Sequence, residues 1–184
     1  LTSMFLHGGL MHLAGNMLFL WIFGDNLEDI LGHIRYLGFY LLSGLAAAAL
    51  QIFADPYSGV PMIGASGAIA GVMGGYLLLF PRAKVDVLII FGIFFRIFPV
   101  PAWVMLGLWF VMQLFSGFST PGDDGGVAYW AHAGGFMAGV VLMVPAWRRL
   151  GGARFWGQNH GMPPHPEATY STVRSHIPRT SRRK

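Results

Sequence analysis

The 184 residues are 54% hydrophobic and only 11% charged, and their mean hydropathy is +0.55. Soluble domains carry about 25% charged residues, so the composition predicts an all-α polytopic membrane protein. The sequence contains no cysteine, which excludes disulfides, thiolate metal sites and cysteine nucleophiles. The formal net charge is +4, so the position of the basic residues must decide whether nucleic acid is a partner.

The first predicted membrane helix runs from about residue 10 to residue 31. His12 and Asn16 lie four positions apart on one face of this helix. Polar groups at membrane depth are costly and usually face the bundle interior, where this pair fits either a functional site or interhelical hydrogen bonding. Glu28, near the other end, opposes the helix macrodipole. We therefore expect Glu28 to have a specific partner, for which Arg35 is a candidate.

A second, nearly uncharged helix is predicted over 36–53, followed by a loop rich in proline, glycine and aspartate. The third predicted helix starts near Ser66 and ends at Phe80. It is short for a span of about 20 residues, so it is expected to begin in a recess below the membrane surface. Small residues recur every fourth position, a spacing that lets helices approach closely. Taken alone, Ser66 also fits a packing helix whose serine bonds its own backbone.

The apolar run 87–95 is too short to span the membrane and is predicted to lie at the interface. A fourth span is predicted over 102–118 and a fifth over about 129–147. His132 stands near the start of the fifth, and Gly135 and Gly139 continue its small-residue stripe. Two such helices can bring His132 and a serine into contact, and a serine beside a histidine base is the minimal activated nucleophile.

The five predicted spans place all 12 Lys and Arg on one side of the membrane. This is the positive-inside pattern, so residues 151–184 are predicted to form a basic, disordered cytoplasmic tail after a membrane domain over 1–150. The one-sided charge also means that no nucleic-acid partner is needed. The same topology puts the two candidate polar pairs at the non-cytoplasmic ends of their helices.

Taken together, these segments resemble the rhomboid family of intramembrane serine proteases. The resemblance covers residues 1–147 and follows the family order. Each run is weak alone, whereas the set is specific. The matching runs are His7-Gly8-Gly9-Leu10-Met11-His12 with Asn16, then Gly24, Glu28 and Gly32, then Gly64-Ala65-Ser66-Gly67, and then Ala131-His132 with Gly135 and Gly139.

The resemblance implies a Ser66 nucleophile with His132 as general base, and no metal or other cofactor. The oxyanion hole would consist of His12, Asn16 and the backbone N–H of Ser66. Structural support is implied for His7, Glu28, Gly67, Gly135 and Gly139. Some members carry an aromatic residue four positions after the nucleophile, stacked on the histidine. That position is Ala70 here, so another group is expected to orient His132.

The family resemblance also implies substrates, location and architecture. The expected partners are single-span transmembrane proteins within the lipid bilayer, and the expected location is a bacterial inner membrane. The usual six-helix core would lack its first helix here, so we expect the chain to be a fragment with five transmembrane helices. A loop containing Asp123 and Asp124 is expected to cap the site. The oligomeric state is left open.

Rival functions lack their motifs. A membrane metalloprotease needs His-Glu-x-x-His, and an aspartyl intramembrane protease needs two buried aspartates. Polar residues on one side only do not make a solute path across the membrane. The remaining alternative is a catalytically inactive rhomboid-like protein that binds transmembrane clients. Such proteins usually lack the serine or the histidine, and both are present here.

Overall fold

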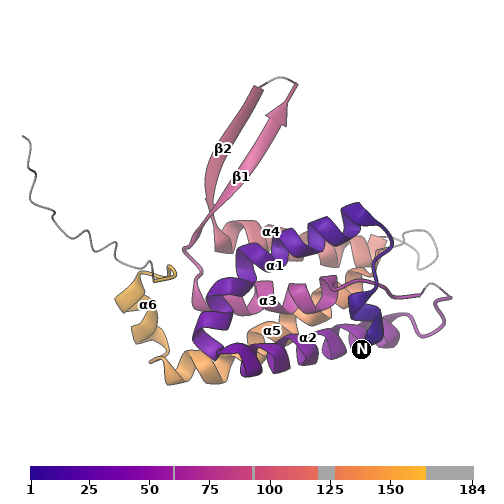
Figure 1. Ribbon diagram of the computed structural model, residues 1–184, viewed down its shortest axis with the longest axis horizontal. Helices are drawn as coiled ribbons and strands as arrows, with labels where there is room; N and C mark the ends of the chain where they lie inside the picture. The colour runs from indigo at the N-terminus through magenta and orange to yellow at the C-terminus, as the bar shows by residue number, and fades with distance from the viewer. Residues whose placement is uncertain (60, 93, 120–126, 165–184) are drawn as a thin grey trace, which may run out of the picture.

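The computed structural model describes residues 1–59, 61–92, 94–119 and 127–164, so Asp123, Asp124 and residues 165–184 lie outside the described residues. The long helices lie side by side, and a β-hairpin projects sideways from one end of the bundle (Figure 1). The elements are η1 (Thr2–Phe5), α1 (Leu10–Leu31), α2 (His33–Ala54), α3 (Ser66–Leu79), β1 (Lys84–Phe91), β2 (Phe94–Pro101), α4 (Ala102–Ser119), α5 (Tyr129–Arg149) and α6 (Ala153–Asn159).

Helix α3 forms the centre of the bundle, although it has only 14 residues. It contacts α1, α2, α4 and α5. A helix that is apolar all round must be buried on all sides, and α3 has this composition. Its buried residues are Ala68, Ile69, Ala70, Gly71, Val72, Met73, Gly74, Gly75, Tyr76 and Leu79. The residue at its start, Ser66, is thereby held in the middle of the helix bundle.

Glycines set the distance between α3 and its neighbours. A Cβ atom on Gly135 of α5 would overlap the carbonyl oxygen of Gly67, and one on Gly139 would overlap that of Gly71. Gly67 itself faces Ala47 of α2, whose Cβ would lie 2.7 Å from an added methyl group. The small-residue stripe of α3 therefore packs against α2 as well as α5, which its spacing alone did not distinguish.

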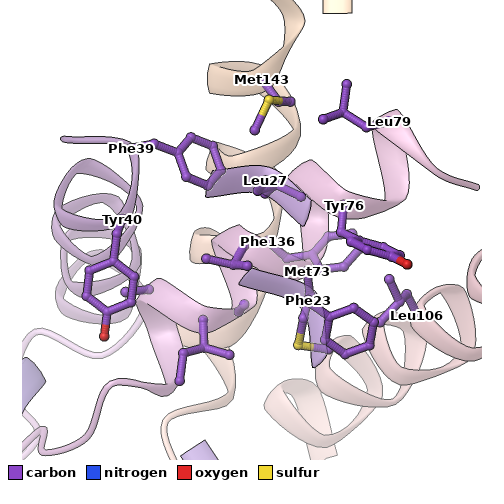
Figure 2. Packing of buried hydrophobic residues seen from close by; sticks show 14 of the residues in the cluster. Phe23, Leu27, Phe39, Tyr40, Met73, Tyr76, Leu79, Leu106, Phe136 and Met143 are labelled. Carbon is purple, nitrogen blue, oxygen red and sulfur yellow. The ribbon is translucent and has the colours of Figure 1, made fainter. Parts of the chain in front are cut away.

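Side chains from all five long helices fill the space around the second half of α3 (Figure 2). Tyr76 lies edge-on to Phe23 at 5.0 Å and to Phe80 at 5.4 Å between ring centroids. In a bilayer such contacts stabilise by van der Waals packing, because lipid tails are as apolar as the side chains. The labelled residues are Phe23, Leu27, Phe39, Tyr40, Met73, Tyr76, Leu79, Leu106, Phe136 and Met143.

The segment predicted as an interfacial apolar run is part of an antiparallel hairpin, which projects from the otherwise helical fold. Lys84 pairs with Pro101 at one end of the ladder, and Phe91 pairs with Phe94 at the other. Apolar side chains are exposed on both faces of its outer part, including those of Ile89 and Ile90. Location at the membrane interface stays a prediction.

Part of the predicted tail is ordered, so the prediction of disorder from residue 151 is wrong for this part. Helix α6 packs against the ends of α3 and α5. Its Trp156 Nε1–H donates to the carbonyl oxygen of Leu78 at 2.9 Å, and the Trp147 and Trp156 rings lie 5.0 Å apart. The two tryptophans hold α6 against the bundle, although the surrounding segment is polar in composition.

The turn between α1 and α2 gives Glu28 a different partner from the one expected. Gly32 has a φ of +74°, a conformation that glycine adopts without strain, and it brings His33 back over the end of α1. Glu28 Oε1 accepts a hydrogen bond from His33 Nδ1 at 2.6 Å. Arg35 is therefore not needed as the partner.

Three of the described helices are long and apolar enough to cross a membrane, namely α2, α4 and α5. Helix α3 is apolar but shorter. The count of five membrane spans remains a prediction, because α1 carries three acidic residues, Asp25, Glu28 and Asp29, near its end.

Candidate active site

The start of α3 and the first turn of α5 place a serine beside a histidine. Ser66 Oγ lies 2.8 Å from His132 Nε2, a hydrogen-bond distance between a hydroxyl and a ring nitrogen. The two residues are 66 positions apart in the chain. Their contact follows from the close backbone approach of Gly67 and Gly135. Gly67 directly follows Ser66, and Gly135 lies three residues after His132.

A cavity of about 660 Å³ opens at this pair. Its walls include residues of α1, α2, α3, α4 and α5. His12, Asn16, Ser66 and His132 all line the cavity. The polar residues that the sequence spacing placed at one depth therefore share one space.

The ring of His12 is oriented by the loop that precedes α1. The backbone N–H of Gly8 donates to His12 Nδ1 at 3.3 Å, so the ring proton of neutral His12 belongs on Nε2. Nε2 points at Gly64, where an added Cβ would lie 2.8 Å from it and 3.8 Å from Ser66 Oγ. His12 thus presents an N–H donor next to the serine.

Asn16 and the backbone of Ser66 supply two further donors in the same cavity. Asn16 is 7% exposed, and its Nδ2 donates one hydrogen bond to the carbonyl oxygen of His12 at 3.0 Å. A primary amide carries two N–H donors, so the second remains for another acceptor. Ser66 is the first residue of α3, and the N–H groups of a first helical turn have no intrahelical acceptor.

Gly64 lets the chain reach this arrangement. Its φ is +117°, which disfavours any residue with a side chain. Its N–H donates to the carbonyl oxygen of Ser3 in η1 at 2.9 Å. A side chain at position 64 would also overlap the His12 ring. Gly64 therefore couples the start of α3 to both η1 and α1.

Comparison with known proteins identifies the family. The sequence profile described as Rhomboid domain matches residues 1–149. The chain belongs to the rhomboid family. This membership, together with the apolar helices, confirms the prediction of a polytopic, mainly helical membrane protein.

Three relatives illustrate the range of rhomboid sequences that resemble this one. Identity is 34% with Rhomboid protein 1, mitochondrial, of Saccharomyces cerevisiae, over 76% of this chain and 39% of the relative. It is 31% with RHOMBOID-like protein 5 of Arabidopsis thaliana, over 77% and 41%, and 32% with Rhomboid protease GluP of Bacillus subtilis, over 79% and 26%. The chain thus spans less than half the length of these relatives.

The remaining candidate residues of this rhomboid chain lie outside the cavity wall. The His7 ring packs edge-on against the His12 ring, with 5.2 Å between the centroids. This contact restrains the His12 ring. Glu28 bonds His33 at the far end of α1. Gly139 backs onto Gly71, away from the serine. No group of three or more His, Asp or Glu side chains is arranged to hold a metal ion within the described part of the rhomboid chain.

Two glutamines contact the start of α5, and sequence reasoning identified neither. Gln51 Oε1 of α2 accepts a hydrogen bond from the N–H of Ala131 at 3.1 Å. Gln113 Oε1 of α4 lies 2.8 Å from His132 Nδ1. Composition could have indicated Gln113, because it is the only amide side chain in the apolar sequence of α4.

Proposed function

We propose that this rhomboid chain is a serine endopeptidase that cleaves transmembrane segments of membrane proteins through a dyad of Ser66 and His132. The 2.8 Å contact between Ser66 Oγ and His132 Nε2 carries the proposal, because it joins a nucleophile to a base inside a cavity. The similarity to Rhomboid protease GluP of Bacillus subtilis supports the same reaction class.

Acylation begins when Ser66 Oγ attacks the carbonyl carbon of the scissile peptide bond. His132 Nε2 accepts the hydroxyl proton as the carbon–oxygen bond forms. The resulting tetrahedral intermediate collapses when the bond between its carbon and the amide nitrogen breaks. His132 returns its proton to the leaving amine, and the new N-terminus departs.

Deacylation uses the same groups in the reverse direction. A water molecule gives a proton to His132 Nε2 and attacks the ester carbon. The bond to Ser66 Oγ breaks, and the serine recovers its proton from His132. The products are two peptides, and the enzyme is regenerated without a net change in charge.

The negative charge of each tetrahedral intermediate requires donors that are already in place. His12 Nε2–H, the second N–H of Asn16 and the backbone N–H of Ser66 are proposed for this role, since the three residues line one cavity. One such donor is typically worth about 2.7–4 kcal/mol in the transition state.

The shortness of α3, from which a start below the membrane surface is proposed, supports a substrate that lies in the membrane. A transmembrane helix hides its carbonyl groups in hydrogen bonds, and breaking these in lipid costs several kcal/mol per group. The proposed substrates are therefore single-span proteins with helix-breaking residues near their non-cytoplasmic end. We also propose that the bundle end with Arg82, Arg148 and Arg149 faces the cytoplasm of a bacterial inner membrane.

The test is cleavage of a single-span substrate by the full-length protein in proteoliposomes. Ser66→Ala and His132→Ala should each abolish cleavage, and a chelator should have no effect. Replacing the helix-breaking residues of the substrate with leucine should also prevent cleavage. Substrate binding with no cleavage by the unmodified protein would favour the client-binding alternative, and inhibition by a chelator that zinc reverses would contradict the dyad.

A further inference from the structure

Helix α4 contacts the proposed base on the side opposite Ser66. His132 Nδ1 lies 2.8 Å from Gln113 Oε1, while Nε2 of the same ring lies 2.8 Å from Ser66 Oγ. An amide oxygen can only accept hydrogen bonds. The Nδ1 atom must therefore carry the ring proton, which leaves the lone pair of Nε2 directed at the serine hydroxyl.

We propose that Gln113 is a positioning residue that fixes His132 as the Nδ1–H tautomer and thereby makes Nε2 the base. The inference rests on the proposed function of the dyad. A histidine free to adopt the other tautomer would point an N–H at Ser66 and could not accept its proton. Gln113 disfavours that tautomer because its acceptor oxygen Oε1, and not its NH2 group, faces Nδ1.

The same face of α4 also restrains the ring of His132. Trp109 stands one helical turn before Gln113, so both side chains lie on one stripe. Its ring centroid is 5.8 Å from that of His132 and 6.0 Å from that of Phe136. Phe110 stacks on Phe136 at 4.8 Å. These contacts hold α4 where Gln113 reaches the base.

This arrangement identifies the groups that orient His132 in the absence of an aromatic residue at position 70. Ala70 is buried in α3 and has no ring to place against the histidine. Trp109 of α4 supplies an aromatic contact, and Gln113 adds a hydrogen bond. In this rhomboid chain, α4 therefore orients the base, while α3 supplies the nucleophile.

The test compares Gln113→Leu, Gln113→Glu and Met112→Leu in the full-length protein. Gln113→Leu removes the acceptor, so kcat should fall about 10- to 100-fold with little change in KM. This is below the roughly 10⁴-fold cost measured where a serine triad loses a charged acceptor and adopts the wrong tautomer. Met112 lies on the exposed side of α4, so Met112→Leu should match the unmodified protein.

The pH profile separates positioning from packing. Gln113→Glu keeps the acceptor and adds a negative charge that stabilises the protonated ring. Cleavage should therefore persist, while its loss on the acidic side should move to higher pH. His12 and Asp55 also line the cavity, and both are unchanged in these variants. A Gln113→Glu profile identical to that of the unmodified protein would contradict the proposal.

A spectroscopic measurement that does not depend on catalysis tests the tautomer of His132 directly. In ¹⁵N-histidine spectra of Ser66→Ala, the proton of neutral His132 should be on Nδ1, and Gln113→Leu should remove this preference. A proton on Nε2 of His132 in the presence of Gln113 would overturn the inference. Cleavage by Ser66→Ala would instead overturn the proposed function. An inactive Ser66→Ala with a fully active Gln113→Leu would refute the role of Gln113 alone.

Discussion

Helix α5 meets its two neighbours in different ways, and His132 lies where the two contacts converge. Against α3, backbone meets backbone, because Gly135 and Gly139 lie on the carbonyl oxygens of α3. Against α4, the contact consists of side chains, chiefly aromatic rings and Gln113. The first contact leaves no room for adjustment, whereas rotamers can adjust the second. The position of Ser66, the proposed nucleophile, therefore depends on glycine, and the orientation of His132, the proposed base, depends on side chains.

The backbone contact should tolerate no added atom. In Gly135→Ala, the methyl group would overlap the carbonyl oxygen of Gly67, and separation of the helices would move Ser66 from His132. A misplacement of about 1 Å alone can cost roughly 100-fold in rate, and separation of the helices also breaks the Ser66–His132 hydrogen bond, so cleavage in proteoliposomes should fall below detection. Gly67→Val should also abolish cleavage, through its clash with Ala47 of α2. Normal activity of Gly135→Ala would show that the contact is adjustable.

The donors on α1 should have the next largest effect. Asn16→Ala removes one proposed oxyanion donor but leaves the α3–α5 contact intact. We expect kcat to fall roughly 100- to 1,000-fold with a smaller change in KM, because the interaction strengthens only in the transition state. Steady-state kinetics in detergent or liposomes measures both constants. A change in KM alone would make Asn16 a substrate contact instead.

The side-chain contact should give a graded loss. Trp109→Leu removes ring contacts with His132 and Phe136, and each aromatic pair is worth about 0.5–1.5 kcal/mol. Cleavage should therefore fall by roughly tenfold, which corresponds to about 1.4 kcal/mol in the barrier. Complete loss of cleavage in a folded variant would show that the α4 contact is as demanding as the α3 contact.

A glycine outside both contacts provides the smallest effect and the matched control. An added Cβ on Gly107 of α4 meets no atom within 4 Å. Gly107→Ala should leave cleavage unchanged and stabilise the helix by about 0.5–1 kcal/mol. Thermal unfolding in detergent checks the gain. Destabilisation of several kcal/mol would indicate a contact at this position that the structure lacks.

Residue spacing predicted much of the site, because glycine repeats and polar residues at helix ends show, within one segment, which residues share a helix face and a depth. His12, Asn16, Ser66 and His132 could be placed at one depth, and the structure puts all four on one cavity. Gln113 was not predicted, since a single amide in an apolar helix has no repeat that shows which way it points. Only the packing of α4 on α5 brings Gln113 to His132.

Two parts of the fold were hidden by composition. The outer part of the hairpin, residues 88–90 and 94–95, is apolar on both faces, so it lacks the alternation that identifies a half-buried strand. Helix α6 lies in a polar segment, and its position depends on Trp156 reaching the carbonyl oxygen of Leu78. Both elements are defined by contacts between distant residues, which local sequence patterns do not record.

The most direct test of the central claim is covalent labelling of the full-length protein with a fluorophosphonate, followed by mass spectrometry of its peptides. We predict a single adduct on Ser66 and its loss in His132→Ala, since the serine is activated only by the adjacent base. Gln113→Leu should be labelled more slowly at the same residue. An unlabelled Ser66 in a protein that still cleaves its substrate would contradict the account.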